Sequence, residues 1–413
     1  MERKEVFILG SGFSREIHKD MPLLNELTGL VIGRIEAEDG IFRNIYERYM
    51  KNRNIGNFEE ILTYLYQDFP WKSEEEKHLL YSLYIRLAKI ATEVIKEKQD
   101  TAVKKELLAK EYIKKFLNYL NDTKANVISL NYDTLLEELS ILELKPIIYT
   151  ESKEEGRNFE YLQEIRYLKD IYGKHTSKEN KVKIKSNGKR AIVIYFYNYD
   201  VGEQDFKSAI ANFNNDKCEN DLKNVYSTFK SQMKEKYINY LNLYQIPIAY
   251  LKSRTAAIFG ATDYETYRLL KLHGSINWYY SATKEKTFEQ IYLFKGSKEE
   301  RESKDLVPVI IPPVLDKTGF FEHSTIKSMW SEAKNRLKEA KKVYIIGYSI
   351  PQTDLTVKFM LQSYIPEDCE VTIVNKDEER KDYFRKLFGK KLNEEFIRSD
   401  DSVFEDFVKS TMR

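Results

Sequence analysis

Four short apolar runs along the chain each end at a glycine or an asparagine. They are residues 6–9 before Gly10, 127–130 before Asn131, 343–346 before Gly347 and 371–374 before Asn375. A helix-like stretch follows each run. Apolar runs without polar alternation are typical of strands covered on both faces, as in a parallel sheet with helices on either side. The pattern therefore predicts an α/β fold, with a Rossmann-like parallel sheet and helices on both of its faces.

The chain between these runs divides into two kinds of sequence. Residues 55–121 carry the spacing of amphipathic helices. From 151 to 265 the pattern changes to a Lys-rich polar segment, a strand-like run at 191–197 and a helical Tyr/Leu-rich stretch near 220–251. We expect one discontinuous domain, residues 1–150 and 266–413, interrupted by a mixed α/β insertion at 151–265.

Composition narrows the functional classes. The 413 residues carry 67 basic and 65 acidic side chains, a net charge of +2, which argues against binding nucleic acid by charge alone. Cys218 and Cys369 are the only cysteines, so neither a disulfide framework nor a cysteine-based zinc site is expected. Without a signal peptide or an apolar run near twenty residues, we predict a cytoplasmic protein with no membrane association.

The first run leads into a glycine turn. In parallel sheets ligands bind beyond the carboxyl ends of the strands, where all four polar turns fall. Gly10 and Gly12 allow a tight turn with amide N–H groups free to face a phosphate, ahead of a helix starting near Ser14. Arg15 takes the third-glycine position of the dinucleotide fingerprint, which disfavours a hydride-transferring dehydrogenase. Alternatively, the glycines serve only the geometry of the turn.

Three later positions carry candidate chemistry. Asn131 and Asp133 follow the second run and are either pocket residues or turn and cap residues. His273 follows an apolar run and is either a catalytic base or a hydrogen-bonded core histidine. Asn375 either contacts a ribose or an adenine edge, or caps the following helix. No two histidines have metal-ligand spacing, so no metal site is expected.

Together these segments resemble the sirtuin superfamily, and more narrowly the bacterial sirtuin-like NAD glycohydrolases of antiphage defence. The shared motifs, in order, are Gly-x-Gly-Phe-Ser at 10–14, Asn-Tyr-Asp-x-Leu at 131–135, Leu-His-Gly-Ser at 272–275, Pro-Pro at 312–313 and Gly-Tyr-Ser-x-x-x-x-Asp at 347–354. The resemblance covers nearly the whole chain outside the insertion.

The resemblance implies a role for each matched position. The residues expected to hold the NAD diphosphate are Gly10, Ser11, Gly12, Phe13 and Ser14. Asn131 and Asp133 would line the pocket for nicotinamide and its ribose, with Asn131 and His273 catalytic. The residues expected to contact the remaining phosphate and the adenosine half are Gly347, Tyr348, Ser349 and Asn375.

Two departures from the protein-deacylating sirtuins matter. Their four-cysteine zinc module cannot form here, and their Pro-Asp-Phe-Arg sequence after the glycine turn is missing. We therefore expect hydrolysis of NAD+ to nicotinamide and ADP-ribose, as a regulated effector of abortive infection. A non-catalytic sensor of NAD or ADP-ribose and an NAD-dependent protein deacylase remain alternatives.

Such an activity needs restraint, because uncontrolled NAD+ hydrolysis poisons a cell. The resemblance implies control by homo-oligomerisation and by a companion ATPase of the HerA translocase type, with a short Argonaute protein as the alternative companion.

Overall fold

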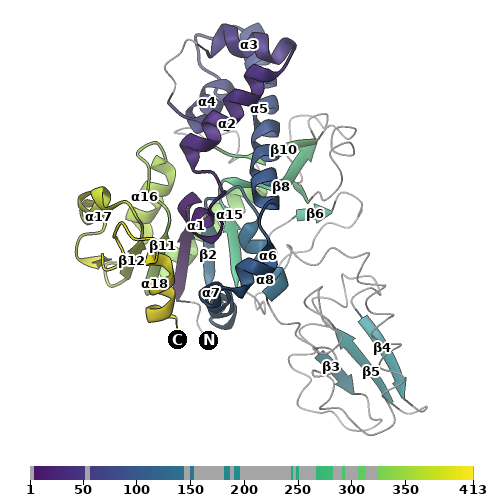
Figure 1. Cartoon of the computed structure of the whole chain (residues 1–413), viewed down its shortest axis with the longest axis vertical. Coiled ribbons are helices and arrows are strands. Elements are labelled where there is room, and N and C mark those ends of the chain that lie inside the picture. The colour runs from purple at the N-terminus through teal and green to yellow at the C-terminus, as the bar shows by residue number, and fades with distance from the viewer. Residues whose placement is uncertain are drawn as a thin grey trace. The chain divides into compact units, whose positions relative to one another are not determined.

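The computed structural model describes residues 4–51, 56–143, 149–152, 181–186, 190–195, 243–244, 248–250, 267–281, 291–293, 306–312 and 324–412. Its centre is a six-stranded sheet in the order β13-β12-β11-β1-β2-β7. All five strand pairs are parallel. The strands are β1 (Glu5–Leu9), β2 (Asn126–Ser129), β7 (Arg268–Lys271), β11 (Lys342–Ile346), β12 (Glu370–Val374) and β13 (Leu392–Asn393). This confirms the predicted α/β fold with a Rossmann-like parallel sheet (Figure 1).

The four apolar runs form four neighbouring strands, β12, β11, β1 and β2. Their side chains are buried almost throughout, as expected for strands covered on both faces. The register aligns their ends: Leu9 pairs with Ile346 on one side and Ser129 on the other, and Ile346 pairs with Val374. The turns that follow these strands therefore emerge side by side at one edge of the sheet.

Helices surround the sheet and extend beyond its edge, and most of one further helix, α8, belongs to a second compact unit. They are α1 (Ser11–Ile17), α2 (Leu24–Ala37), α3 (Ile41–Tyr49), α4 (Phe58–Tyr66), α5 (Glu74–Asp100), α6 (Lys104–Ala109), α7 (Glu111–Asp122), α8 (Leu135–Glu143), α15 (Ser324–Glu339), α16 (Leu355–Tyr364), α17 (Lys381–Phe388) and α18 (Val403–Thr411). Figure 1 shows α2, α3 and α4 gathered along α5, and these helices are in contact. Helices α4 to α7 confirm the helical periodicity read from residues 55–121.

Local signals explain where two of these helices begin. Asn57 accepts hydrogen bonds from the amides of Glu59 and Glu60 at the start of α4. Ser73 and Glu76 form a reciprocal capping box at the start of α5, a helix of 27 residues. Helix α1 begins at Ser11, earlier than the expected start near Ser14. Within the described residues no helix has the length and hydropathy of a membrane span.

A second sheet begins directly after His273. Its strand order is β10-β8-β9-β6, from β6 (Ile248–Tyr250), β8 (Gly274–Ser281), β9 (Ile291–Leu293) and β10 (Leu306–Ile310). Strand β10 continues into Ile311, whose amide donates to the His273 carbonyl. The second sheet therefore fixes the backbone at the residue that the sequence singled out.

The chain divides into two compact units. One comprises Met1–Leu136, Leu243–Ala257 and Tyr264–Arg413; the other comprises Glu137–Asn242 and Ile258–Asp263. In the second unit the structure describes an antiparallel sheet in the order β3-β5-β4, from β3 (Tyr149–Ser152), β4 (Lys181–Ser186) and β5 (Arg190–Tyr195). The boundaries of the 151–265 insertion stay a prediction.

Two expectations for the insertion can be compared with the described residues. Strand β5 agrees with the strand-like run at 191–197 as far as Tyr195. The helical stretch near 220–251 lies outside the described residues, except at 243–244 and at Ile248–Tyr250. The latter is strand β6, so the helical expectation is wrong there.

The turns after β1 and β11 pack backbone against backbone. A Cβ atom on Gly347 would lie 2.1 Å from the Phe13 nitrogen and 2.4 Å from the Gly12 carbonyl carbon. A Cβ atom on Gly12 would lie 2.8 Å from the Gly347 oxygen. Gly347 also has a φ of 61°, a left-handed conformation that other residues rarely adopt. Only glycine fits at this contact.

We expect Gly347→Ala to lower the free energy of unfolding by at least about 3 kcal/mol, because the new methyl group meets backbone that cannot move aside. Urea unfolding followed by circular dichroism measures the change.

Gly33→Ala is the matched control. Gly33 lies on the exposed face of α2, and a Cβ atom added there would have no neighbouring atom within 4 Å. That substitution should raise stability by about 0.5–1 kcal/mol through helix propensity. Equal behaviour of the two variants would contradict the tight contact.

Candidate active site

The turns at the carboxyl edge of the parallel sheet enclose a cavity of about 910 Å³, large enough for a nucleotide ligand. It lies within the unit that contains this sheet. The predicted site residues that line it are Gly10, Ser11, Gly12, Phe13, Asn131, Asp133, His273, Gly347, Tyr348, Ser349 and Asn375. Ser14 lies behind the lining and contacts two of these residues. The structure therefore brings together segments that are far apart in the sequence.

Asn131 is held in one orientation by its amide nitrogen. Nδ2 lies 2.9 Å from the Gly10 carbonyl oxygen and 2.9 Å from Ser14 Oγ. Because a backbone carbonyl can only accept, the atom facing Gly10 must be the NH2 group, which settles the orientation of the amide. Asn131 Oδ1 is buried and has no hydrogen-bond partner within the described chain. Asn131 lines the cavity, and its side chain keeps one buried acceptor without a partner in the described chain.

A buried acceptor without a partner costs about 1–3 kcal/mol unless a water molecule or a ligand supplies a donor. A ribose hydroxyl, a carboxamide NH2 group and a water molecule all qualify. Asn131 thus has the chemistry of a residue that can orient one donor.

Asp133 accepts hydrogen bonds from other parts of the chain in addition to lining the cavity. Its Oδ2 accepts from Ser14 Oγ at 2.7 Å, and its Oδ1 accepts from the Leu135 amide at 3.1 Å at the start of α8. The buried ammonium of Lys271 donates to the Asp133 backbone carbonyl. Asp133 therefore holds the turn before α8 and also lines the cavity, and both of its carboxylate oxygens accept hydrogen bonds from the chain.

His273 follows β7 and is 3 % exposed. Its Nε2 lies 3.3 Å from Asp354 Oδ2, and Asp354 is itself 1 % exposed. The Tyr348 hydroxyl donates to the same oxygen at 2.7 Å. Burial raises the pKa of Tyr348 well above its ordinary value, and the Asp354 carboxylate is the second-largest cause of this rise. The hydroxyl therefore stays protonated.

The sequence did not assign Asp354 to the site. It was expected only as the last residue of the 347–354 motif. In the structure α16 begins at Leu355, and Asp354 is its N-cap. The spacing of five residues from Ser349 to Asp354 was the available signal, but nothing in it points to His273.

The glycine turn differs from its expected role. The Gly10 amide donates to the Ile346 carbonyl at 3.0 Å, and the Gly12 amide donates to the Gly347 carbonyl at 2.9 Å. The Phe13 amide donates to Gly10 at 2.9 Å. The expectation that the amides of this turn stay free for a phosphate is therefore wrong for these three. The neighbouring turn is what approaches the glycines closely.

Asn375 also holds a turn. Its Oδ1 accepts from the Asp377 amide at 2.9 Å, and its Nδ2 lies 3.4 Å from the Tyr348 carbonyl oxygen. Arg380, which the sequence did not single out, lines the cavity and donates to the Ser349 carbonyl at 2.8 Å. This side of the cavity is thus linked through Tyr348 and Ser349 to the turn after β11.

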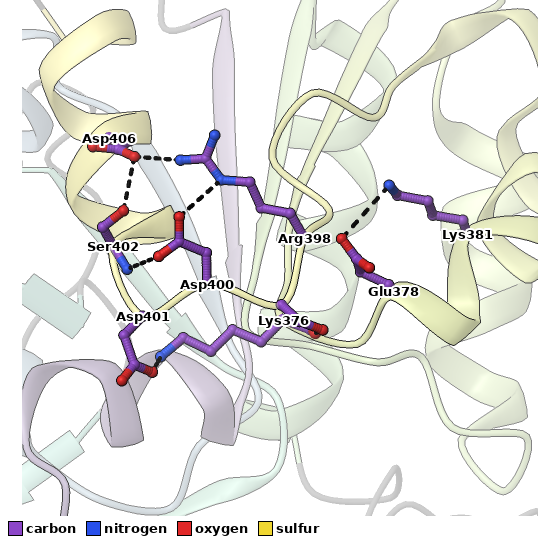
Figure 2. A network of polar contacts seen from close by, with 9 residues as sticks. Lys376, Glu378, Lys381, Arg398, Asp400, Asp401, Ser402 and Asp406 are labelled. Atoms are coloured by element: carbon purple, nitrogen blue, oxygen red, sulfur yellow. Dashed lines mark hydrogen bonds and ion pairs between the residues drawn. The ribbon is translucent and has the colours of Figure 1, made fainter.

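The basic residues lining the cavity form ion pairs with carboxylates of the chain. Arg15 pairs with Glu26, and Arg380 lies 3.3 Å from Asp377. Lys376 pairs with Glu16 at 2.7 Å and with Asp401 at 2.9 Å. Figure 2 shows the pair of Lys376 with Asp401 beside a second group in which Arg398 pairs with Asp400 and Asp406. These contacts tie the segment before α18 to the end of β12.

No group of three or more His, Cys, Asp or Glu side chains in the described part of the chain is arranged to hold a metal ion. The polar residues that line the cavity include Asn131, His273, Tyr348 and Asp354.

Comparison with known proteins adds little to this geometry. No protein-family model matches the chain, and no curated protein matches it. Among solved structures, the chain is similar to one described as "Structural Basis for the Mechanism and Regulation of Sir2 Enzymes". The identity is 13%, the TM-score is 0.23, and the match covers 58% of this chain and 85% of the other. A likeness this distant carries no argument, so the fold rests on the strand order and the parallel register.

Ser14→Ala should lower the free energy of unfolding by about 1–3 kcal/mol, because it leaves one Asp133 oxygen and one Asn131 N–H group buried without their partner. Urea unfolding measures the effect. Ser11→Ala is the control: Ser11 is exposed on the same helix, and its loss should change stability by less than about 0.5 kcal/mol. Equal effects of the two substitutions would contradict the buried network.

Proposed function

We propose that the protein cleaves NAD+ to nicotinamide and ADP-ribose. One observation carries the proposal: Asn131, whose carbonyl oxygen has no partner in the described chain, and His273 line the same cavity at the carboxyl edge of a parallel sheet. In such sheets this edge is the usual place for a nucleotide. The order of the motifs along the sequence supports the same substrate.

The chemistry of NAD+ suits these groups. The nicotinamide is attached to the ribose as a cationic pyridinium and leaves as a neutral molecule, so its departure needs no general acid. A pair of catalytic carboxylates, as in ordinary glycosidases, is therefore unnecessary. The protein has to hold the ribose, exclude bulk water and position one water molecule to attack the anomeric carbon.

Asn131 and His273 divide these tasks in the proposed reaction. The Asn131 carbonyl oxygen accepts a hydrogen bond from a ribose hydroxyl or from the attacking water. His273 accepts the proton that the hydroxyl or the water gives up as the oxocarbenium-like state collapses. Water supplies the oxygen of the new hydroxyl group, and one proton is released overall.

The remaining assignments follow from the same pose. In the proposed complex, Gly10, Ser11, Gly12 and Phe13 would contact the diphosphate, and Ser349 and Asn375 would contact the adenosine half. Since the Gly10, Gly12 and Phe13 amides are already bonded, contacts from this turn to phosphate would come from the remaining polar groups, such as the exposed Ser11 side chain.

His273→Gln and Asn131→Ala should each lower NAD+ turnover by about a hundredfold to ten-thousandfold, because each removes a group acting in the transition state. The measurement is chromatographic detection of nicotinamide and ADP-ribose. His78→Gln is the matched control, since His78 is exposed on α5 and does not line the cavity. Full activity in Asn131→Ala would sink this assignment.

The chromatographic assay, combined with calorimetry of NAD+ binding, separates two alternative functions. Saturable NAD+ binding by calorimetry without nicotinamide release would favour a sensor of NAD or ADP-ribose. Nicotinamide release that depends on an acetylated peptide would favour a protein deacylase. The chain has only two cysteines, too few for the zinc module of the deacylating family that its motifs resemble.

We further propose that the activity is latent and serves antiphage defence by abortive infection. Control would come from homo-oligomerisation and from a companion ATPase of the HerA translocase type, with a short Argonaute as the second candidate. The support is the motif resemblance and the need to restrain NAD+ loss.

Purification of the tagged chain from cells that express each candidate companion should recover a complex with the ATPase. NAD+ turnover of that complex should exceed that of the isolated chain. Recovery of the chain alone with either companion would count against this regulation.

A further inference from the structure

Asp354 is buried more deeply than its capping role requires. Its Oδ1 accepts from the Val357 amide at 3.4 Å, a long hydrogen bond, and the side chain is 1 % exposed. Serine or asparagine caps a helix as well as aspartate does. Removing a carboxylate from water is costly unless it is compensated by strong partners. The capping bond alone therefore does not account for a buried carboxylate here.

The second carboxylate oxygen faces two side chains from different parts of the sheet edge. The Tyr348 hydroxyl, after β11, donates to Oδ2 at 2.7 Å, and His273 Nε2, after β7, lies 3.3 Å from the same atom. The distance to His273 is at the long end of a hydrogen bond, as is common before a substrate is bound. Asp354 and His273 both line the cavity.

Other titratable groups surround the pair. Glu59, on α4, lines the cavity and raises the pKa of both Tyr348 and Tyr132. For each tyrosine, burial is the larger cause, so both phenols remain neutral. The Tyr132 ring lies 6.4 Å from the His273 ring, and its hydroxyl donates to the Ile311 carbonyl at 3.2 Å. The carboxylate of Asp354 lies directly beside the imidazole.

We propose that Asp354 is the positioning residue for His273 in the NAD+ cleavage proposed above. The carboxylate holds the imidazole with its proton on Nε2, so that Nδ1 carries the lone pair that accepts a proton from the ribose hydroxyl or the water. The proton moves from oxygen to Nδ1, the Nε2 proton stays on the Asp354 side, and the resulting imidazolium is stabilised by the carboxylate. Tyr348 holds the carboxylate in place.

Asp354→Asn tests this proposal without removing the cap. Asparagine accepts from the Val357 amide as aspartate does, but its NH2 group can face His273, which favours the opposite tautomer. We expect kcat to fall on the order of a hundredfold to ten-thousandfold, with KM for NAD+ changed less than threefold or so. Thermal unfolding should show a folded protein.

Asp382→Asn is the matched control, because Asp382 lies on α17 with 83% of its side chain exposed. It should retain the kcat of the unaltered protein. Unchanged kcat in Asp354→Asn as well would overturn the proposal and leave Asp354 as a helix cap.

The tautomer can be read without any activity. The chain has five histidines, and the spectrum of His273→Gln identifies the ring signals of His273 among them. In the ¹⁵N-histidine-labelled protein at about pH 9, above the reference imidazole pKa of about 6.5, two-bond ¹⁵N–¹H correlations report which nitrogen carries the proton. We expect Nε2–H in the unaltered protein and Nδ1–H in Asp354→Asn.

The two measurements keep the proposals separate. A protein that releases no nicotinamide but shows the expected tautomers would refute the proposed function and retain Asp354 as the partner of His273. A protein that cleaves NAD+ while His273 carries its proton on Nδ1 would refute the positioning role alone.

Discussion

The site depends on the contact between two backbone turns. Where the chain leaves β1, it packs directly on the turn that follows β11, and at Gly12 and Gly347 there is no room for a side chain. The residues that follow each of the two turns make the contacts that form the site. On one side, Ser14 bonds to Asn131 and Asp133. On the other, Tyr348 and Asp354 follow Gly347 and lead to His273.

Much of this architecture can be predicted from the sequence. Uninterrupted apolar runs identify buried parallel strands, and the carboxyl ends of such strands must share one edge, which is why Asn131, His273 and the glycine turn were expected to meet. The segment that packs against the glycines could not be predicted, because the sequence shows that a side chain is absent but not which neighbouring residue leaves no room for one. The same holds for Asp354. Its partner His273 is brought near by two sheets at once, and no spacing along the chain encodes that distance.

The polar groups that line the cavity differ in whether the protein itself already supplies their partners. Among its lining residues, Asn131 uses the donors of its amide on the chain and keeps one acceptor without a partner in the described residues. At its margin, the cations Arg15, Lys376 and Arg380 already lie beside carboxylates. An anionic ligand would therefore have to compete with carboxylates of the protein for these cations.

The strand order also decides when the cavity can exist. During synthesis, β1 and its turn emerge first, but both of the strands that flank β1, and the backbone that Gly12 packs against, are made later. A nascent polypeptide that carries the glycine turn, Asn131 and even His273 still lacks Gly347, Tyr348 and Asp354. The cavity can therefore form only after the ribosome has translated the turn at Gly347 and the residues that follow it. A product truncated before this turn would contain the N-terminal glycine motif but could not form the cavity.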